Sequence, residues 1–469
     1  MMAKADIKKG MRLVFVDFLG LVIGILNGFF LPMVFSIDGY ALFRTFSLYA
    51  TYAVVFSFGL SDGLYLMYGG KDEKDLDASR TKAYYFFLMK LQAVVCAAMF
   101  VLSWFVLNDT ALIFFSLFIT PLQLIHFFRL YYRALGEFDK YSFLQSILVV
   151  FELLNTLFIV FYVRSQSPHL FISIKIVNHV IVSTLLSMLF LARYKGIGRA
   201  RLKWSDYYAV MKPGFAVLMA DVVAALIFSL DRWFIKALFT NADFAYYSFA
   251  VSMLNLFLVF ITSVTNIFYS YISKRIEDDN YIRNLKNIVL VISSFFPAGY
   301  FILEYIIKAY LSNYSEALEV LWILMLTLPF ISIINVLYIN LYKASKSIKV
   351  YLIKITVVLG ISFVLNIVAY MIFSTAAAIA WATFVSLVVW YFYSTGDFQG
   401  IGINMKEVGY LLFLFISFFI FKGSDMGLAL SLLSLTAALA ADVLIFYRKD
   451  IIHIFGIIRE NVYTGKGLK

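Results

Sequence analysis

Long apolar segments recur along the whole chain, and they constrain its fold more than any other feature. Each is roughly 20 residues long, enough for a helix to cross about 30 Å of hydrocarbon at about 1.5 Å per residue. Transmembrane strands would need only about ten residues and would alternate apolar with polar positions. With 63% hydrophobic and 14% charged residues, the composition also lies outside the range of soluble domains. The sequence therefore predicts an all-α polytopic membrane protein.

About fourteen transmembrane helices are expected, twelve core helices and two additional ones. The thirteenth span is short, and it can instead form half of a re-entrant hairpin with the fourteenth, which would leave twelve spans. The predicted spans are residues 10–33, 41–67, 83–107, 111–132, 142–163, 169–192, 208–238, 244–272, 287–310, 317–341, 351–373, 376–394, 408–421 and 426–447.

Lysine and arginine are distributed unevenly between the two sides of these spans. If the N-terminus is cytoplasmic, 31 of the 39 basic residues lie in cytoplasmic segments and only five lie on the opposite side. Short basic loops are retained in the cytoplasm during insertion. We therefore expect both termini to be cytoplasmic in a bacterial inner membrane. The net charge of +11 reflects this topology and the proximity of anionic lipid headgroups rather than a nucleic-acid partner.

Several other function classes lack their sequence features. The single cysteine, Cys96, lies within the third span and excludes an intramolecular disulfide. The chain has no phosphate-binding glycine loop of the Walker type, and its loops are too short for a nucleotide-binding domain. We therefore expect no cofactor and no metal site. Any transport would use a proton or sodium gradient or the concentration gradient of the substrate.

Two similar cytoplasmic connections indicate an internal repeat. LYYRALGEFDKY at 130–141 and NLYKASKSIKVY at 340–351 share tyrosine, basic and alanine positions, and six spans separate them. A six-span shift preserves orientation, which predicts two parallel lobes related by a pseudo-two-fold axis along the membrane normal. The predicted organisation is an N-terminal lobe at 1–193, a linker at 194–207, a C-terminal lobe at 208–394, two helices at 395–447 and a tail at 448–469.

Residues 212–254 resemble a known family, the bacterial polysaccharide flippases of the O-antigen type. These belong to the multidrug/oligosaccharidyl-lipid/polysaccharide exporter superfamily. Pro213, Asp231, Arg232, Tyr247 and Ala250 match the family pattern of its seventh and eighth helices, although an alanine at 245 replaces the usual glycine. Further collinear similarity extends over the stretches 39–66, 343–351 and 376–386.

The resemblance implies two six-helix lobes in a V and transport by alternating access. The implied substrate is an undecaprenyl-diphosphate-linked oligosaccharide, moved from the inner to the outer leaflet for O-antigen, capsule or other exopolysaccharide synthesis. The resemblance also suggests a polysaccharide polymerase complex as a partner. We expect the chain itself to be monomeric and to be a transporter rather than an enzyme.

Cations within the spans are the candidate ligands for such a substrate, because an unpaired diphosphate is costly to move through hydrocarbon. Arg44, Lys90, Lys175 and Arg232 are the predicted cavity cations. Three of them also have a simpler interpretation, whereas Lys90 lies too deep in its span to reach the interface readily. Arg44 can extend to the membrane interface, while Lys175 can pair with Glu152 across the N-terminal lobe. Asp231 and Arg232 point about 100° apart on one helix, so they cannot simply neutralise each other. We expect Arg232 to face the central cavity or the lobe interface and Asp231 to brace local structure. The simpler interpretation is an architectural role for both.

Two carboxylates are candidates for ion coupling. Asp221 lies near the middle of the seventh span, and Asp17 is its rough counterpart in the first. A carboxylate at membrane depth must be protonated, paired or hydrated. Either group can therefore bind a proton or a sodium ion during transport.

Two alternative functions remain within the same superfamily. A multidrug/cation antiporter would favour an acidic cavity, to which Asp17, Glu152 and Asp221 can contribute. A lipid II flippase agrees with fourteen spans, but its cationic first helix has no counterpart in this chain. A membrane-embedded enzyme would be expected to carry larger loops or an acidic metal-binding cluster.

Overall fold

A computed structural model describes residues 18–448 apart from 21, 346, 399–400, 403 and 425. The described residues form helices and connecting turns and no β-strand, which confirms the predicted all-α class. Ten of these helices are long and apolar enough to cross a membrane, or eleven if a bent pair is counted as one span. The total of fourteen spans stays a prediction.

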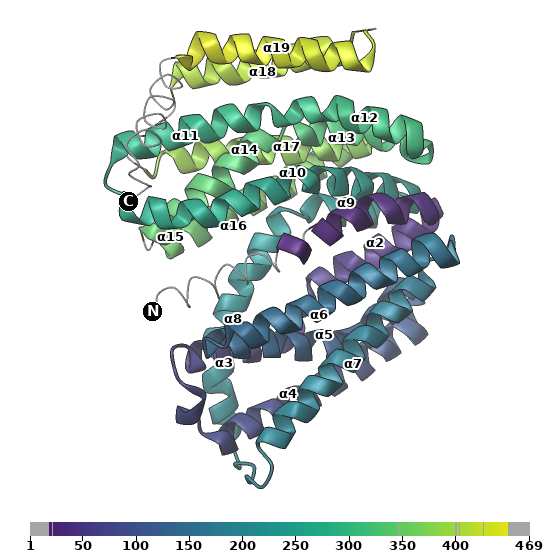
Figure 1. Ribbon diagram of the computed structural model, residues 1–469, viewed down its shortest axis with the longest axis vertical. Helices are drawn as coiled ribbons and strands as arrows, with labels where there is room; N and C mark the ends of the chain where they lie inside the picture. The colour runs from purple at the N-terminus through teal and green to yellow at the C-terminus, as the bar shows by residue number, and fades with distance from the viewer. Residues whose placement is uncertain are drawn as a thin grey trace. The chain divides into compact units, whose positions relative to one another are not determined.

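The chain divides into two compact units (Figure 1). Unit 1 is Met1–Phe228 with Thr240–Ala245, and unit 2 is Ser229–Phe239 with Tyr246–Lys469. The sequence-based boundary differed, because residues 208–238 were assigned to the second lobe. In the structure most of that span forms a helix that packs within unit 1.

Unit 1 contains an unlabelled helix over the described residues 18–20 and 22–34, followed by seven labelled α-helices and four short 3-10 or π segments. The bounds are α2 (Ile37–Thr51), η1 (Ala53–Ser57), α3 (Leu60–Tyr68), η2 (Glu73–Asp75), α4 (Ala78–Val101), η3 (Leu102–Leu107), α5 (Thr110–Ala134), α6 (Phe138–Leu157), η4 (Phe158–Val163), α7 (His169–Arg193) and α8 (Trp204–Ile227).

Helix α5 is the centre of unit 1, where it packs against α2, α3, α4, α6 and α7. Its aromatic side chains form much of a buried cluster in which Phe127, Phe128 and Tyr131 contact Tyr85 and Phe190. Large aromatic surfaces that interlock in this way fix the angles between neighbouring helices. The rest of the unit is arranged around this helix.

The second predicted span is broken rather than continuous. Helix α2 ends at Thr51 and α3 starts at Leu60, with η1 between them. Phe58 and Gly59 adopt positive φ angles of 49° and 77° at the break. A side chain on Gly59 would also overlap the backbone of Phe215 on α8. Glycine at this position thus permits both the turn and the close approach of the two helices.

Unit 2 contains the remaining helices. Its elements are α9 (Leu230–Leu238), α10 (Asn241–Lys274, whose first residues group with unit 1), α11 (Asp279–Ser294), η5 (Phe296–Ala298), α12 (Gly299–Tyr310), η6 (Ser312–Tyr314), α13 (Ala317–Met325), α14 (Leu328–Ile333), η7 (Ile334–Tyr338), α15 (Ile339–Ala344), α16 (Ile348–Phe373), α17 (Ala376–Thr395), α18 (Met405–Lys422) and α19 (Leu428–Phe446).

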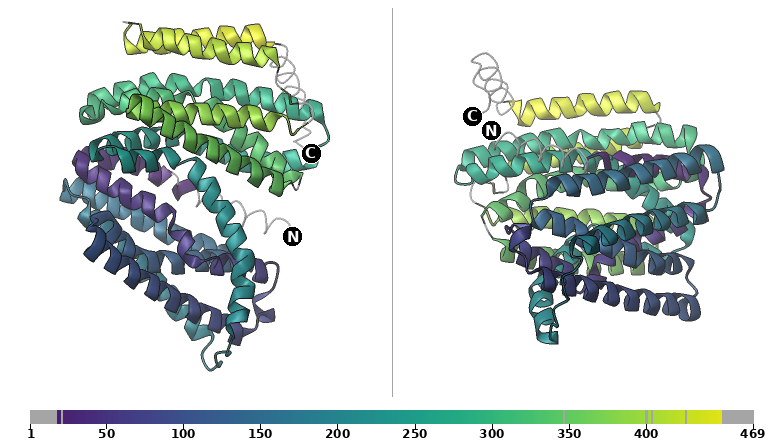
Figure 2. Two further views of the ribbon diagram at one scale, coloured as in Figure 1. Left: turned by 180° about the vertical axis from the view of Figure 1, so that it is seen from behind. Right: turned by 60° about the horizontal axis from the view of Figure 1, so that its bottom comes forward.

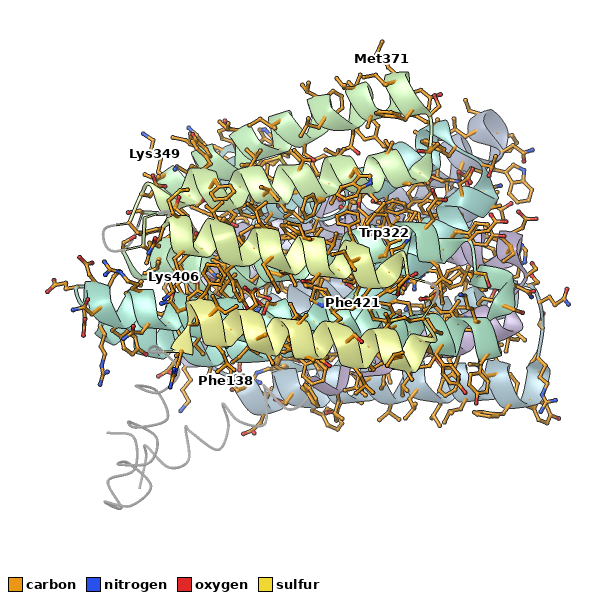
Figure 3. The ribbon with its side chains drawn as sticks, turned by 90° about the horizontal axis from the view of Figure 1, so that it is seen from above. Phe138, Trp322, Lys349, Met371, Lys406 and Phe421 are labelled. Carbon is orange, nitrogen blue, oxygen red and sulfur yellow. The ribbon has the colours of Figure 1, made fainter. Side chains whose placement is uncertain are left out.

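Helices α18 and α19 form a hairpin, and α19 contacts α12 (Figure 2). Of the two, α19 is among the helices that are long and apolar enough to cross a membrane. The thirteenth span, predicted to be short, corresponds to α18, which carries Lys406, Glu407 and Lys422 at its ends, and its crossing of the membrane stays a prediction. In unit 2 the basic residues Lys349 and Lys406 lie at one end, and Met371 and Phe421 lie at the other (Figure 3). Lys422, next to Phe421, lies at that opposite end of α18.

Two further predicted spans are interrupted. The seventh ends at Ile227, and the short α9 follows after Ser229. The tenth bends by 48° between Met325 and Leu328, where Pro329 at the start of α14 has no backbone N–H for the preceding turn. Apolar composition alone does not reveal such breaks, because it stays uniform through them.

Candidate functional site

Four polar side chains meet in unit 1. They lie in the first helix and in the halves of α6 and α7 that are nearer to the connection between those two helices. Lys175 donates to Glu152 Oε1 at 2.8 Å, and Asn27 Nδ2 donates to the same oxygen at 3.1 Å. Thr156 Oγ1 in turn donates to Asn27 Oδ1 at 2.5 Å. We call Asn27, Glu152, Thr156 and Lys175 the Glu152 network. It joins three helices through charged and neutral hydrogen bonds.

The Glu152 network is partly accessible. The side chains of Lys175 and Glu152 are 23% and 19% exposed, whereas Asn27 and Thr156 are buried. The predicted pairing of Lys175 with Glu152 is therefore confirmed. Because the pair is neutral overall, an anionic substrate would meet Lys175 only as half of an ion pair.

Arg44 lies in the middle of α2 and is half-buried. Its Nε donates to the hydroxyl of Tyr40 at 2.7 Å, and the guanidinium lies 4.9 Å from the centre of the same ring. The Phe43 ring is also within 5.6 Å. Such stacking holds the flat guanidinium in one orientation and is compatible with paired hydrogen bonds to a phosphate.

The other predicted cations have different surroundings. Lys90 is exposed on α4. Arg232 lies on α9, in unit 2, and is half-buried. The four predicted cations are thus divided between the two units, with Arg44, Lys90 and Lys175 in unit 1.

Asp231 has the bracing role that was predicted for it. It is 6% exposed, its Oδ1 accepts from the backbone N–H of Arg232 at 2.7 Å, and its Oδ2 accepts from the Tyr247 hydroxyl at 2.7 Å. Thr383 on α17 also hydrogen-bonds to it. The carboxylate therefore holds α9, α10 and α17 together within unit 2.

Asp221 is exposed on α8, and its charge acts on a second carboxylate, Asp62 of α3. Asp62 is 6% exposed, and its Oδ2 has no hydrogen-bond partner among the described residues. Asp17, the other predicted coupling residue, lies outside the described residues. The structure thus adds Asp62 as a candidate beside Asp221.

Sequence analysis missed three of these residues. The sequence pattern assigns no role to Asn27, Thr156 or Asp62. The signal for Asp62 was present, since an aspartate inside an apolar span is a candidate functional residue by itself. Threonine and asparagine give no comparable signal, because single residues of these types are common in membrane helices.

No family model and no curated protein matches the sequence. Solved structures with the same fold do exist. A structure of the lipid II flippase MurJ in an inward closed conformation matches with a TM-score of 0.69 at 17% identity, covering 95% of this chain and 100% of that one. A structure of the MATE multidrug transporter DinF-BH matches with a TM-score of 0.52 at 12% identity, covering 84% of this chain and 94% of that one.

A third structure, the Vibrio cholerae MATE transporter VcmN, matches with a TM-score of 0.51 at 12% identity, covering 83% of this chain and 95% of that chain. At these identities the likeness concerns the fold. The chain therefore shares the fold of these flippase and MATE structures, and its long apolar helices make it a multi-pass membrane protein.

Proposed function

We propose that the protein is a flippase for a polyprenyl-diphosphate-linked saccharide and not an enzyme. The extent of the structural likeness carries this proposal. The lipid II flippase structure matches with a TM-score of 0.69, whereas the two MATE transporters match with TM-scores of 0.51 and 0.52. A carrier for a large lipid-linked headgroup thus shares more of this architecture than carriers of small molecules do.

The O-antigen type resemblance makes an oligosaccharide repeat unit on undecaprenyl diphosphate the first candidate substrate, and the structural likeness makes lipid II the second. The cations Arg44, Lys90, Lys175 and Arg232 would compensate the diphosphate during passage by alternating access across the inner membrane. Both termini would be cytoplasmic.

A proton or sodium gradient would drive the cycle through Asp221 and Asp62. Moving one charge through about 100 mV supplies about 2.3 kcal/mol, enough to bias a conformational equilibrium. The same two carboxylates favour the second candidate function, a multidrug/cation antiporter, because acidic groups attract organic cations.

Reconstitution into proteoliposomes tests these possibilities. Wild type and the variants Arg44→Ala, Lys90→Ala and Arg232→Ala would be compared at equal protein content, using undecaprenyl-diphosphate oligosaccharide, lipid II and an organic cation in parallel. We expect translocation of a lipid-linked saccharide that falls at least about tenfold in the Arg44→Ala variant, corresponding to about 1.4 kcal/mol. Lys422→Ala, at the end of α18, is the matched control for loss of one positive charge.

The outcomes separate the proposals. Wild-type activity on the organic cation alone would replace the flippase with the antiporter. Activity on a lipid-linked saccharide that no variant affects would overturn the cationic path and leave the flippase. Dependence on a sodium or proton gradient that is lost in both Asp221→Asn and Asp62→Asn would support ion coupling.

A further inference from the structure

A groove runs between α6 and α7 in unit 1, with α5 as its floor. The two helices diverge from their shared connection, as Figure 1 shows. The resulting cavity has a volume of about 900 Å³, near the upper end of the range for ligand pockets. The side chains that face it from α6 and α7 are mainly apolar, among them Phe143, Ile147, Val150, Ile181, Leu185 and Leu189.

The apolar walls follow the helical repeat on both sides. Phe143, Ile147 and Val150 are spaced by four and three residues on α6, and Ile181, Leu185 and Leu189 are spaced by four on α7. Each set therefore forms a stripe on one helix face. The corresponding helices six spans later, α16 and α17, contact each other much more extensively than α6 and α7 do.

The mouth of the groove carries both signs of charge. Arg193 Nη2 lies 2.5 Å from Glu73 Oε2, and Lys140 Nζ lies 3.2 Å from Glu137 Oε1 and 4.0 Å from Glu73. The Tyr131 hydroxyl donates to Glu73 at 3.3 Å. Asp139 is a further carboxylate in the lining. Three carboxylates and two cations thus meet where the apolar walls end.

We propose that this groove binds a phospholipid with an ethanolamine headgroup. The acyl chains would cover the two apolar stripes. The phosphate would accept from Lys140 and Arg193, whose side chains are 41% and 54% exposed and so accessible to a ligand. The primary ammonium would donate to the surrounding carboxylates, which outnumber the cations.

The charges at the mouth favour this headgroup over its alternatives. A purely anionic lipid such as phosphatidylglycerol would face the excess of carboxylates without a cation of its own to pair with them. A choline headgroup has no N–H to donate. The site is separate from the proposed transport function, because it does not require the lipid to be translocated and a diphosphate would be disfavoured there.

Lipid titration of the purified full-length protein, followed by native mass spectrometry, tests the proposal. The probes are palmitoyl-oleoyl phosphatidylethanolamine and phosphatidylglycerol. We expect at least about tenfold tighter binding of the ethanolamine lipid, equal to about 1.4 kcal/mol. Val150→Trp should fill the groove and lower that affinity by a similar factor.

Leu154→Trp is the matched control, because Leu154 lies one turn further along α6 and is 55% exposed but does not line the groove. A second variant, Lys140→Gln, tests the phosphate contact on an exposed side chain, and it should lower the affinity for both lipids because both carry the phosphate that Lys140 would bind. Equal binding of the two lipids would overturn the headgroup assignment. If Val150→Trp and Leu154→Trp lowered the affinity for the ethanolamine lipid equally, or if neither lowered it, the groove would not be the binding site.

Discussion

Lys286 on α11 and Glu407 on α18 form a buried salt bridge of 2.8 Å between side chains that are only 2% and 5% exposed. Lys286 also donates to the carbonyl of Ile401 at 3.3 Å, and the Tyr391 hydroxyl donates to Glu407. The pair joins the C-terminal hairpin to the body of unit 2. Loss of one partner would leave the other charge buried without compensation.

We therefore expect Lys286→Met to lower the free energy of unfolding by about 3–5 kcal/mol. The double variant Lys286→Met/Glu407→Met should regain most of that loss, because it leaves no uncompensated charge. Chemical denaturation of the full-length protein in detergent measures both values. Lys308→Met is the control, since its partner Glu304 is one turn away and Lys308 is 55% exposed. An equal loss in Lys308→Met would contradict the role given to burial.

The Glu152 network should behave as a coupled unit. Glu152→Gln and Lys175→Gln should each destabilise the protein, and the double variant should cost less than the sum of the two. We expect a coupling energy of about 0.5–3 kcal/mol, the range for residues in direct contact. A double-mutant cycle on the free energy of unfolding measures it. Strict additivity would show that the 2.8 Å contact contributes nothing to stability.

Two glycines on α3 and α8 permit the contact between these helices. A Cβ on Gly63 would overlap the carbonyl oxygen of Val210, and one on Gly214 would overlap the carbonyl oxygen of Gly59. Gly63→Ala and Gly214→Ala should therefore each destabilise the protein by about 1–3 kcal/mol through overpacking.

Gly360→Ala on α16 should have the opposite sign. Nothing lies within 4 Å of a Cβ at Gly360, so alanine should stabilise the helix by about 0.5–1 kcal/mol. Unfolding of the three alanine variants under one set of conditions gives the comparison. Stabilisation in all three would mean that α3 and α8 separate at little cost.

The hydrogen bond from Tyr247 to Asp231 should contribute to the stability of unit 2. Tyr247→Phe removes the donor 2.7 Å from a buried carboxylate oxygen, which should cost about 1–3 kcal/mol. Tyr305→Phe is the control, because Tyr305 is 61% exposed and such surface changes stay within about 0.5 kcal/mol. Equal effects would indicate that Thr383 and the Arg232 backbone satisfy Asp231 without Tyr247.

Hydrophobic runs and charge placement were enough to predict the helical class, the membrane-spanning character and the pairing of Lys175 with Glu152. This pairing can be predicted because both residues lie inside adjacent apolar spans, where an ion needs a partner nearby. The pairing of Lys286 with Glu407 cannot be predicted in the same way. Lys286 was counted among the cytoplasmic basic residues, and its partner is 121 positions away.

The breaks within the second, seventh and tenth spans depend on the backbone rather than on hydropathy. At Phe58 a bulky residue adopts a positive φ angle, which sequence propensity disfavours. The surrounding helix contacts decide such positions, so they require the tertiary structure.

The close contact between α3 and α8 affects how the protein can form during synthesis. Unit 1 includes α8 and Thr240–Ala245, but the residues between them belong to unit 2. The ribosome therefore makes the first piece of the second unit before the first unit is complete. Domains commonly fold in order from the N-terminus, yet here the first unit must wait for Ala245. Until α8 itself is made, the face of α3 that Gly59 and Gly63 form lacks the helix that covers it in the complete unit.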